Sequence, residues 1–198
     1  MCQLTQLAKL IQQTKQFLLA FAFSLLPFAS IFPQEIWITQ PFIQTQGRLN
    51  KDGAIGLSSW AITNVGYSGY QLSRTTGQEY HFHKMNLIWS GIDLAIGIPT
   101  FIRSHRIYKG KVQLKLDKYN PKKYLTIFSL NSWLDLAYVG AGFIVKSRAS
   151  HSTDPNRLKG YGNSIIMQGG FLFSFDTVMY LLHRKLYKNH LQNSFKSN

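Results

Sequence analysis

Four stretches of the chain contain neither Lys nor Arg and are rich in apolar and small residues: 53–70, 86–102, 124–145 and 160–182. A helix needs about 20 residues to cross the roughly 30 Å hydrocarbon layer of a bilayer, and about 17 to 25 are tolerated. The last two stretches fit this length well, and the first two fit near its lower limit. The pattern therefore predicts an all-α integral membrane four-helix bundle over residues 53–185.

The flanks of this bundle carry different signals. Lys9 and Lys15 precede the apolar run FLLAFAFSLLPF, which has the form of a signal peptide. No pair of small residues suited to a signal peptidase follows the run, so residues 1–31 are either a signal-like segment or an uncleaved N-terminal span. Residues 32–52 contain two prolines and few apolar runs, which predicts a linker. Residues 186–198 are expected to form a basic tail.

Charge narrows the range of partners. The chain has 22 Lys and Arg against 8 Asp and Glu, a net charge of +14, which favours anionic lipid headgroups or nucleic acid. Eight of the basic residues lie in RSHRIYKGKVQLKLDKYNPKKY, residues 103–124, interleaved with apolar residues. This pattern predicts an interfacial segment that binds anionic headgroups, and a solvated basic loop is the plain alternative. We therefore expect the lipid bilayer of a cell membrane as partner and no nucleic acid.

Two features of the composition limit other functions. The mean hydropathy of −0.09 is low for a membrane protein and supports the alternative of a soluble, basic, helical nucleic-acid-binding protein. The single cysteine, Cys2, excludes an intrachain disulfide and a cysteine metal cluster.

Three segments carry a family resemblance: TTGQEYHFHKMNLIWSGIDLAIG, LNSWLDLAYVGAGF and RLKGYGNSIIMQGGFLFSFDTVMYLLH. In this order they resemble an uncharacterised family of small four-helix bacterial membrane proteins, known mainly from Bacteroidetes. The family is defined by a domain of unknown function. The resemblance spans roughly Arg48 to His183. It implies a membrane bundle behind a signal-like N-terminus, and it implies no activity, cofactor or catalytic residue.

Each predicted helix has a polar face. Residues His83, Asn86, Ser90, Asp93 and Gly97 recur at spacings of three and four, which places them on one side of a helix. Similar faces hold Trp60, Asn64 and Ser68, then Asn131, Asp135, Tyr138 and Gly142, and finally Gly169, Asp176 and His183. Polar groups inside a bilayer must find partners within the bundle, so these faces are expected to turn inward.

Depth predicts which polar groups meet. We call the end where the first predicted helix finishes side B and the opposite end side A. At about 1.5 Å of rise per residue, one layer nearer side B collects four residues: Asn64, Asp93, Gln168 and Asp135. Asp176 falls in a second layer nearer side A, where its uncharged partners would be Asn131 and Ser58 or Ser59. His83 and His183 fall on opposite sides, which excludes a metal or haem held by both.

The candidate ligand-binding residues are therefore Asn64, Asp93, Asp135, Gln168, Asn131 and Asp176. One hypothesis is structural: these groups bond across helices and fix the packing, and a protonated, neutral Asp176 donates to Asn131. The other is functional: Asp93 and Asp135, desolvated and close, share a proton or bind a cation or polar ligand.

Catalysis has no positive signal, because no phosphate loop, nucleophile elbow or HExxH motif occurs. The catalytic residues and cofactors are unknown, and no metal site is expected. A membrane enzyme or a proton-coupled transporter using the acids is the alternative function. Four short helices are few for alternating access, so a transporter would require a homo-oligomer.

Two rules for orientation conflict. After the N-terminal segment, fourteen Lys and Arg fall on side A against six on side B, which favours side A as cytoplasmic. A signal-like segment that enters the membrane with Lys9 and Lys15 inside would instead put side A outside.

Overall fold

The computed structural model describes residues 38–112 and 114–196, whose regular secondary structure is helical, with no strand among them. Four long helices and two short 3₁₀ turns follow in order: α2 (Gln40–Leu72), α3 (Gly77–Tyr108), η1 (Leu116–Lys118), α4 (Lys123–Ser147), η2 (Arg148–His151) and α5 (Pro155–Lys196). The predicted all-α, four-helix architecture is thus confirmed. The predicted signal-like segment 1–31 lies outside the described residues.

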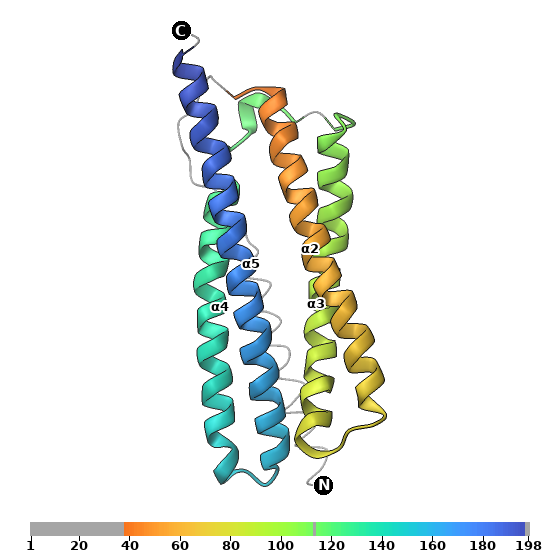
Figure 1. Ribbon diagram of the computed structural model, residues 1–198. Helices are drawn as coiled ribbons and strands as arrows, with labels where there is room; N and C mark the ends of the chain where they lie inside the picture. The colour runs from red at the N-terminus through yellow and green to blue at the C-terminus, as the bar shows by residue number, and fades with distance from the viewer. Residues whose placement is uncertain (1–37, 113, 197–198) are drawn as a thin grey trace. The chain divides into compact units, whose positions relative to one another are not determined.

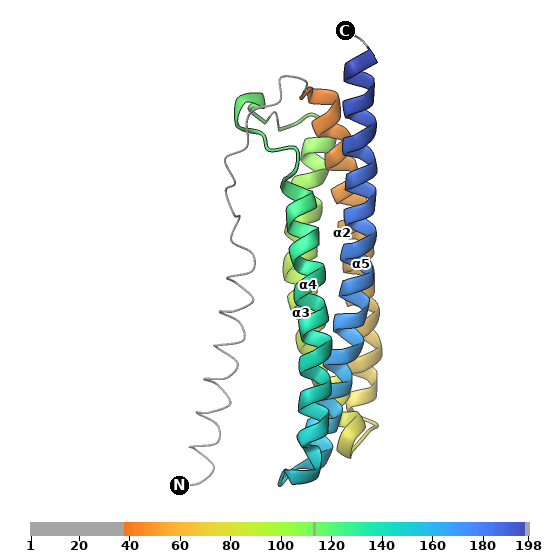
Figure 2. The ribbon, with the colours of Figure 1, turned by 90° about the vertical axis from the view of Figure 1, so that its left-hand side faces the viewer.

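The helices run alternately up and down. α2 and α3 form one antiparallel pair, and α4 and α5 form the other (Figure 1). The pairs meet mainly where α3 packs on α5. α3 and α4 meet through large side chains, since the rings of Trp89 and Tyr138 lie edge to face with centroids 5.3 Å apart. The start of α2, the α3–α4 connection and the end of α5 share one end of the bundle, which is side A (Figure 2).

α2 begins inside the stretch 32–52 that we expected to be a linker. Thr39 caps it, its hydroxyl accepting a bond of 3.4 Å from the amide of Phe42, and a proline occupies the first turn. At about 1.5 Å per residue, α2 is close to 50 Å long, more than a bilayer core requires. The apolar stretch at 53–70 marks only part of this helix, because its first turns bury Phe42 and Ile43 on one side and expose polar residues on the other.

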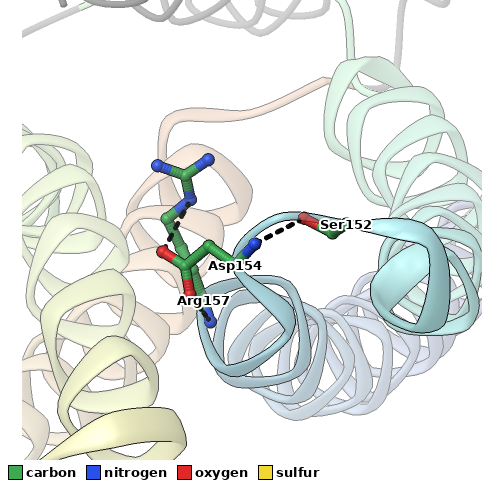
Figure 3. Close-up of polar contacts among 3 residues, drawn as sticks. All are labelled: Ser152, Asp154 and Arg157. Carbon is green, nitrogen blue, oxygen red and sulfur yellow. Dashed lines mark hydrogen bonds and ion pairs between the residues drawn. The ribbon is translucent and has the colours of Figure 1, made fainter.

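The start of α5 is fixed by local bonds (Figure 3). Oδ1 of Asp154 accepts from the amide of Arg157 at 3.1 Å, and Oδ2 lies 3.7 Å from the Nε of the same arginine. The amide of Asp154 donates to the hydroxyl of Ser152 at 3.1 Å. This cap and Pro155 start the helix before the predicted boundary at 160. At its other end α5 continues to Lys196, so most of the predicted basic tail is helical.

Glycines set the contact between α4 and α5. A Cβ at Gly142 would lie 2.9 Å from the carbonyl oxygen of Gly162, and one at Gly162 would lie 2.7 Å from that of Gly142. A Cβ at Gly169 would lie 3.2 Å from the carbonyl oxygen of Asp135. Small residues allow helix backbones to approach this closely in membrane bundles. The approach fixes how far α4 is shifted along α5, and hence which polar residues face one another.

Side A carries a small apolar core. Residues 38–51, 103–112, 114–122 and 184–196 form what we call the side A cap. The buried apolar residues of this core are Ile38, Phe42, Ile43, Ile107 and Tyr187. Leu114, Tyr119, Leu186 and Leu191 of the cap, and Leu125 at the start of α4, pack against them.

Polar bonds tie the α3–α4 connection to α2 within this cap. The side-chain amide of Gln40 donates to the backbone carbonyl of Leu114 at 3.0 Å, and the side-chain amide of Gln46 donates to the backbone carbonyl of Pro121 at 3.2 Å. The Tyr119 hydroxyl donates to Oε1 of Gln46, and burial raises the pKa of this phenol.

Candidate functional site

The remainder of the bundle, residues 52–102 and 123–183, is what we call the central bundle. Its surface carries large apolar side chains, and its interior is rich in polar ones. Its exposed side chains include Trp133, 71% exposed, and Ile62, 61% exposed. Its buried polar residues are Asn64, Ser68, His83, Asn86, Ser90, Asp93, Asp135, Ser164, Gln168, Asp176 and His183. The polar faces predicted on all four helices therefore do turn inward.

Near side B the interior is a closed set of hydrogen bonds among Trp60, Asn64, Asn86 and Gln168, here called the amide cluster. The Trp60 indole donates to Gln168 Oε1 at 2.9 Å, and the Gln168 amide donates to Asn86 Oδ1. The Asn86 amide donates to Asn64 Oδ1 at 2.7 Å and to the Ser68 hydroxyl at 2.8 Å. Asn64 donates in turn to the carbonyl of Trp60 at 2.8 Å. Each amide thus finds a partner on its own or a neighbouring helix, as an interior without water requires.

The middle of the bundle holds three acids from three helices. Asp93 of α3, Asp135 of α4 and Asp176 of α5 are 2%, 4% and 6% exposed. The side chains of Asp135 and Asp176 lie close enough to interact, Asn131 lies beside Asp176, and Asp93 lies within electrostatic range of both other acids. We call these three acids and Asn131 the acid cluster.

α2 contributes Ser58 beside this cluster. Ser58 packs directly on Gly97, since a Cβ there would meet its hydroxyl oxygen, and Gly97 follows Asp93 by one turn on the same face of α3. The Ser58 hydroxyl is buried without a hydrogen-bond partner among the described residues. Oδ2 of Asp93 and Oδ2 of Asp135 are also buried and receive no hydrogen bond from them. The middle of the bundle therefore holds several oxygen atoms that could accept from a donor.

Compensating cations do not reach these acids within the part of the chain that the structure describes. The ion pairs there join Arg48 and Lys51 to Asp52, and Arg157 to Asp154, all in the cap or at side B. In the same residues, no three His, Cys, Asp or Glu side chains are arranged to hold a metal ion.

The predicted layers regroup in the structure. Asn64 and Gln168 join Asn86 in the amide cluster, whereas Asp93 and Asp135 join Asp176. The separate second layer expected for Asp176 is therefore wrong, because Asp176 interacts with Asp135. Asp176 does lie beside Asn131, and the donation from a neutral Asp176 to Asn131 stays a prediction. The cause is that the helices do not begin and end where the apolar stretches do, so a depth measured from the end of a stretch is wrong. α3 begins at Gly77 rather than at 86, which places Asp93 about 13 Å deeper from side B than expected.

The prediction for His183 is wrong in one respect. We expected its ring to stay wet at the side A interface, but the side chain is fully buried, and Nε2 lies 3.0 Å from Oδ1 of Asn50. His83 lies beside Ser68, with 3.2 Å between Nδ1 and the hydroxyl oxygen. Because Asn50 and Ser68 are about 27 Å apart along α2, the two histidines do sit near opposite ends. Asn50 and Asn86 were not among the candidates, although both lie on polar helical faces readable from the sequence.

A family model described as a family of unknown function, DUF6992, matches residues 56–177. The chain belongs to this family. The part matched to DUF6992 contains Ser58 and the whole acid cluster, and it ends before His183. The resemblance to an uncharacterised family is thereby confirmed. Searches of curated proteins and of solved structures give no match.

Three described helices, α3, α4 and α5, are long and apolar enough to cross a membrane. α2 is long enough but is not among them, because polar residues such as Asn64 and Ser68 interrupt its apolar stretch. The sequence pattern is thus compatible with a membrane protein over three helices.

Proposed function

We propose that the chain is a multi-pass protein of a bacterial cell membrane whose interior binds a small cationic hydrogen-bond donor at the acid cluster, with a proton as the first candidate. The observation that carries this proposal is the burial of three carboxyl groups from three helices within electrostatic range of one another, with no cation among the described residues paired to them. A set of charged carboxylates in this position would be strongly unfavourable.

A shared proton relieves most of that cost. Two carboxyl groups close enough to interact, such as those of Asp135 and Asp176, avoid mutual repulsion when one of them is protonated and donates to the other. Asp93 then faces the pair from α3 with one oxygen still open. A proton, or a small protonated amine that donates to several oxygens at once, matches these acceptors better than a metal ion does.

The surface supports membrane insertion. Large apolar side chains such as Trp133, Ile62 and Phe143 are exposed on the central bundle, while its interior is polar. Large exposed apolar side chains around a polar interior are characteristic of contact with lipid. A soluble nucleic-acid-binding protein would leave it in water, so we propose that α2 crosses the membrane beside the three more apolar helices. Alkaline washing should leave the protein in the membrane fraction, and release without detergent would contradict this part of the proposal.

Basic residues at side A support a lipid partner. Arg103, Arg106, Lys123, Arg184 and Lys185 are exposed where the central bundle meets the cap. Such clusters attract anionic headgroups, chiefly on the cytoplasmic side. We propose that side A is cytoplasmic, and a reporter fused after Asn198 should then be active in the cytoplasm. Activity limited to an exported reporter would reverse the orientation.

The acid cluster can be tested by labelling with dicyclohexylcarbodiimide, an apolar reagent that adds to protonated carboxyl groups shielded from water. The intact protein in native membranes should gain the mass of the reagent, and peptide mapping should locate it on the acid cluster. The double variant of Asp135→Asn and Asp176→Asn should lose this label. Asp52→Asn is the matched control, because its carboxyl group is exposed and paired with Lys51, and it should label like the wild type.

The outcomes separate the candidates. Protection from the reagent by methylammonium but not by sodium would identify an amine as the occupant within the proposed class. Protection by sodium would contradict the proposed class, because a metal ion would then occupy the site. Absence of label on all three acids, or equal labelling of the double variant, would contradict a protonated cluster.

A further inference from the structure

His183 occupies the interior between the acid cluster and side A. It follows Asp176 by seven residues on the same face of α5, which puts it about 10 Å nearer side A. α4 continues the same alignment, since Tyr124 and Phe128 stack on the imidazole with centroids at 5.0 and 5.3 Å. Asn131 and Asp135 lie one and two turns further along this face of α4. The acid cluster and His183 therefore belong to one polar seam between α4 and α5.

The tautomer of His183 follows from its partner. Oδ1 of Asn50 can only accept a hydrogen bond, so Nε2, which lies 3.0 Å from it, carries the proton. Nδ1 then presents a bare lone pair, and it is buried without a partner among the described residues. An imidazole held in this way can accept a proton at one nitrogen and release one from the other.

Toward the opposite end of the bundle no described histidine lies next to the acids, and the titratable group beside Asp135 there is the phenol of Tyr138, one turn further along α4. Toward side B the acid cluster meets the amide cluster, whose side chains are neutral amides and an indole bonded to one another. Amides do not gain or lose protons near neutral pH, so passage there would require breaking several bonds at once. His83 lies beyond this cluster, beside Ser68.

We propose that the acid cluster exchanges protons with the aqueous phase on side A through His183. Nδ1 accepts a proton from the side of the acid cluster, and Nε2 releases its own proton to water at side A once its bond to Asn50 Oδ1 breaks. Each passage leaves the imidazole protonated at Nδ1 instead of Nε2, so the ring must return to its first tautomer before the next passage. Around the exit, Asn50 of α2 and Tyr124 of α4 contact the imidazole, and Arg103 of α3 acts electrostatically on Tyr124. Lys51 and Arg184 adjoin Asn50 and His183 in the sequence. This inference rests on the proposed protonation of the acid cluster.

The test is the rate at which the carboxyl protons exchange for deuterium in the reconstituted full chain, followed by the infrared C=O band of protonated carboxyl groups. His183→Gln keeps a donor for Asn50 but cannot relay a proton, and it should slow exchange by about 100-fold, a typical contribution of a positioned proton-transfer group. His83→Gln is the matched control, a buried histidine on the other side of the amide cluster, and should exchange like the wild type.

A protonated band that exchanges equally fast in His183→Gln and wild type would overturn the inference and leave the proposed function standing. Slower exchange in His83→Gln instead would also overturn it. Absence of the band in the wild type would overturn the proposed function itself. If His183→Gln does not fold, the route can be tested with the wild type by a sudden change of pH outside the vesicles. The carboxyl band should change at once in molecules whose side A faces outward, and only later in molecules whose side A faces inward. Equal rates in both orientations would contradict the route through side A.

Discussion

In the side A cap, Phe42, Ile43 and Ile107 are buried, and Arg106 and Lys188 face outward. Along the same helices in the central bundle, Asn86 and Gln168 are buried, and Trp133 faces outward. The helices are continuous from one region to the other, so secondary structure does not account for the reversal. The proposed membrane position of the central bundle accounts for it, because water favours burial of apolar groups, whereas lipid requires polar groups to be satisfied inside.

The contrast also explains the mean hydropathy of −0.09. In the central bundle the polar residues are concentrated in the interior, and the cap adds basic and polar residues outside the apolar stretches. A chain average merges these two regions. A value typical of soluble proteins is therefore consistent with a lipid-facing surface on α3, α4 and α5.

The largest effect is expected from a substitution in the apolar core of the cap. Phe42 is 3% exposed, and Phe42→Ala should destabilise the cap by about 3–5 kcal/mol, because it removes a buried ring and leaves a cavity. Hydrogen exchange followed by mass spectrometry should show faster exchange at 38–51 and 184–196, with the central bundle still protected. Phe143→Ala is the control, since that ring is 56% exposed and its truncation should leave exchange unchanged. Equal loss of protection in both variants would remove the distinction between the regions.

A smaller effect is expected when an arginine is introduced on the exposed surface of each region. Leu136 of α4 and Leu116 of η1 are 43% and 42% exposed, so their exposure is matched while their proposed surroundings differ. Leu136→Arg should disfavour insertion by about 2.5–3.5 kcal/mol, the cost of arginine near the centre of a membrane helix. Leu116→Arg should be nearly neutral. The fraction retained in membranes after alkaline washing measures both, and equal retention would argue against lipid around α4.

The smallest effect is expected inside the central bundle. Asn86→Leu removes bonds to Asn64, Ser68 and Gln168, and bonds between membrane helices contribute about 0.6 kcal/mol on average, with a maximum near 1.7. We expect a loss of about 1–2 kcal/mol in unfolding measured in bicelles. Thr63→Val is the control, because that exposed hydroxyl bonds to the carbonyl of its own helix. A loss as large as that of Phe42→Ala would mean that polar bonds stabilise this interior as strongly as apolar burial stabilises the cap.

The sequence alone determined the helices and their polar faces. Spacings of three and four place Asn86, Ser90 and Asp93 on one side of α3 whatever packs against it, because helical periodicity is local. The absence of basic residues from four stretches likewise marked the helices that form the bundle. The beginning of α2 was missed, although Phe42, Gln46 and Asn50 recur at intervals of four, because a search for apolar stretches does not detect a helix with a mixed face.

Only the tertiary structure decided which polar residues meet. The level of Asp93 depends on where α3 begins, and the level of Asp135 against Asp176 depends on the close approach of Gly142 and Gly162. The site of His183 depends on Asn50, which is 133 positions away in the chain. Periodicity fixes the direction of a side chain around its own helix. It leaves free the shift of one helix along another, which here is set by glycine contacts and by the cap.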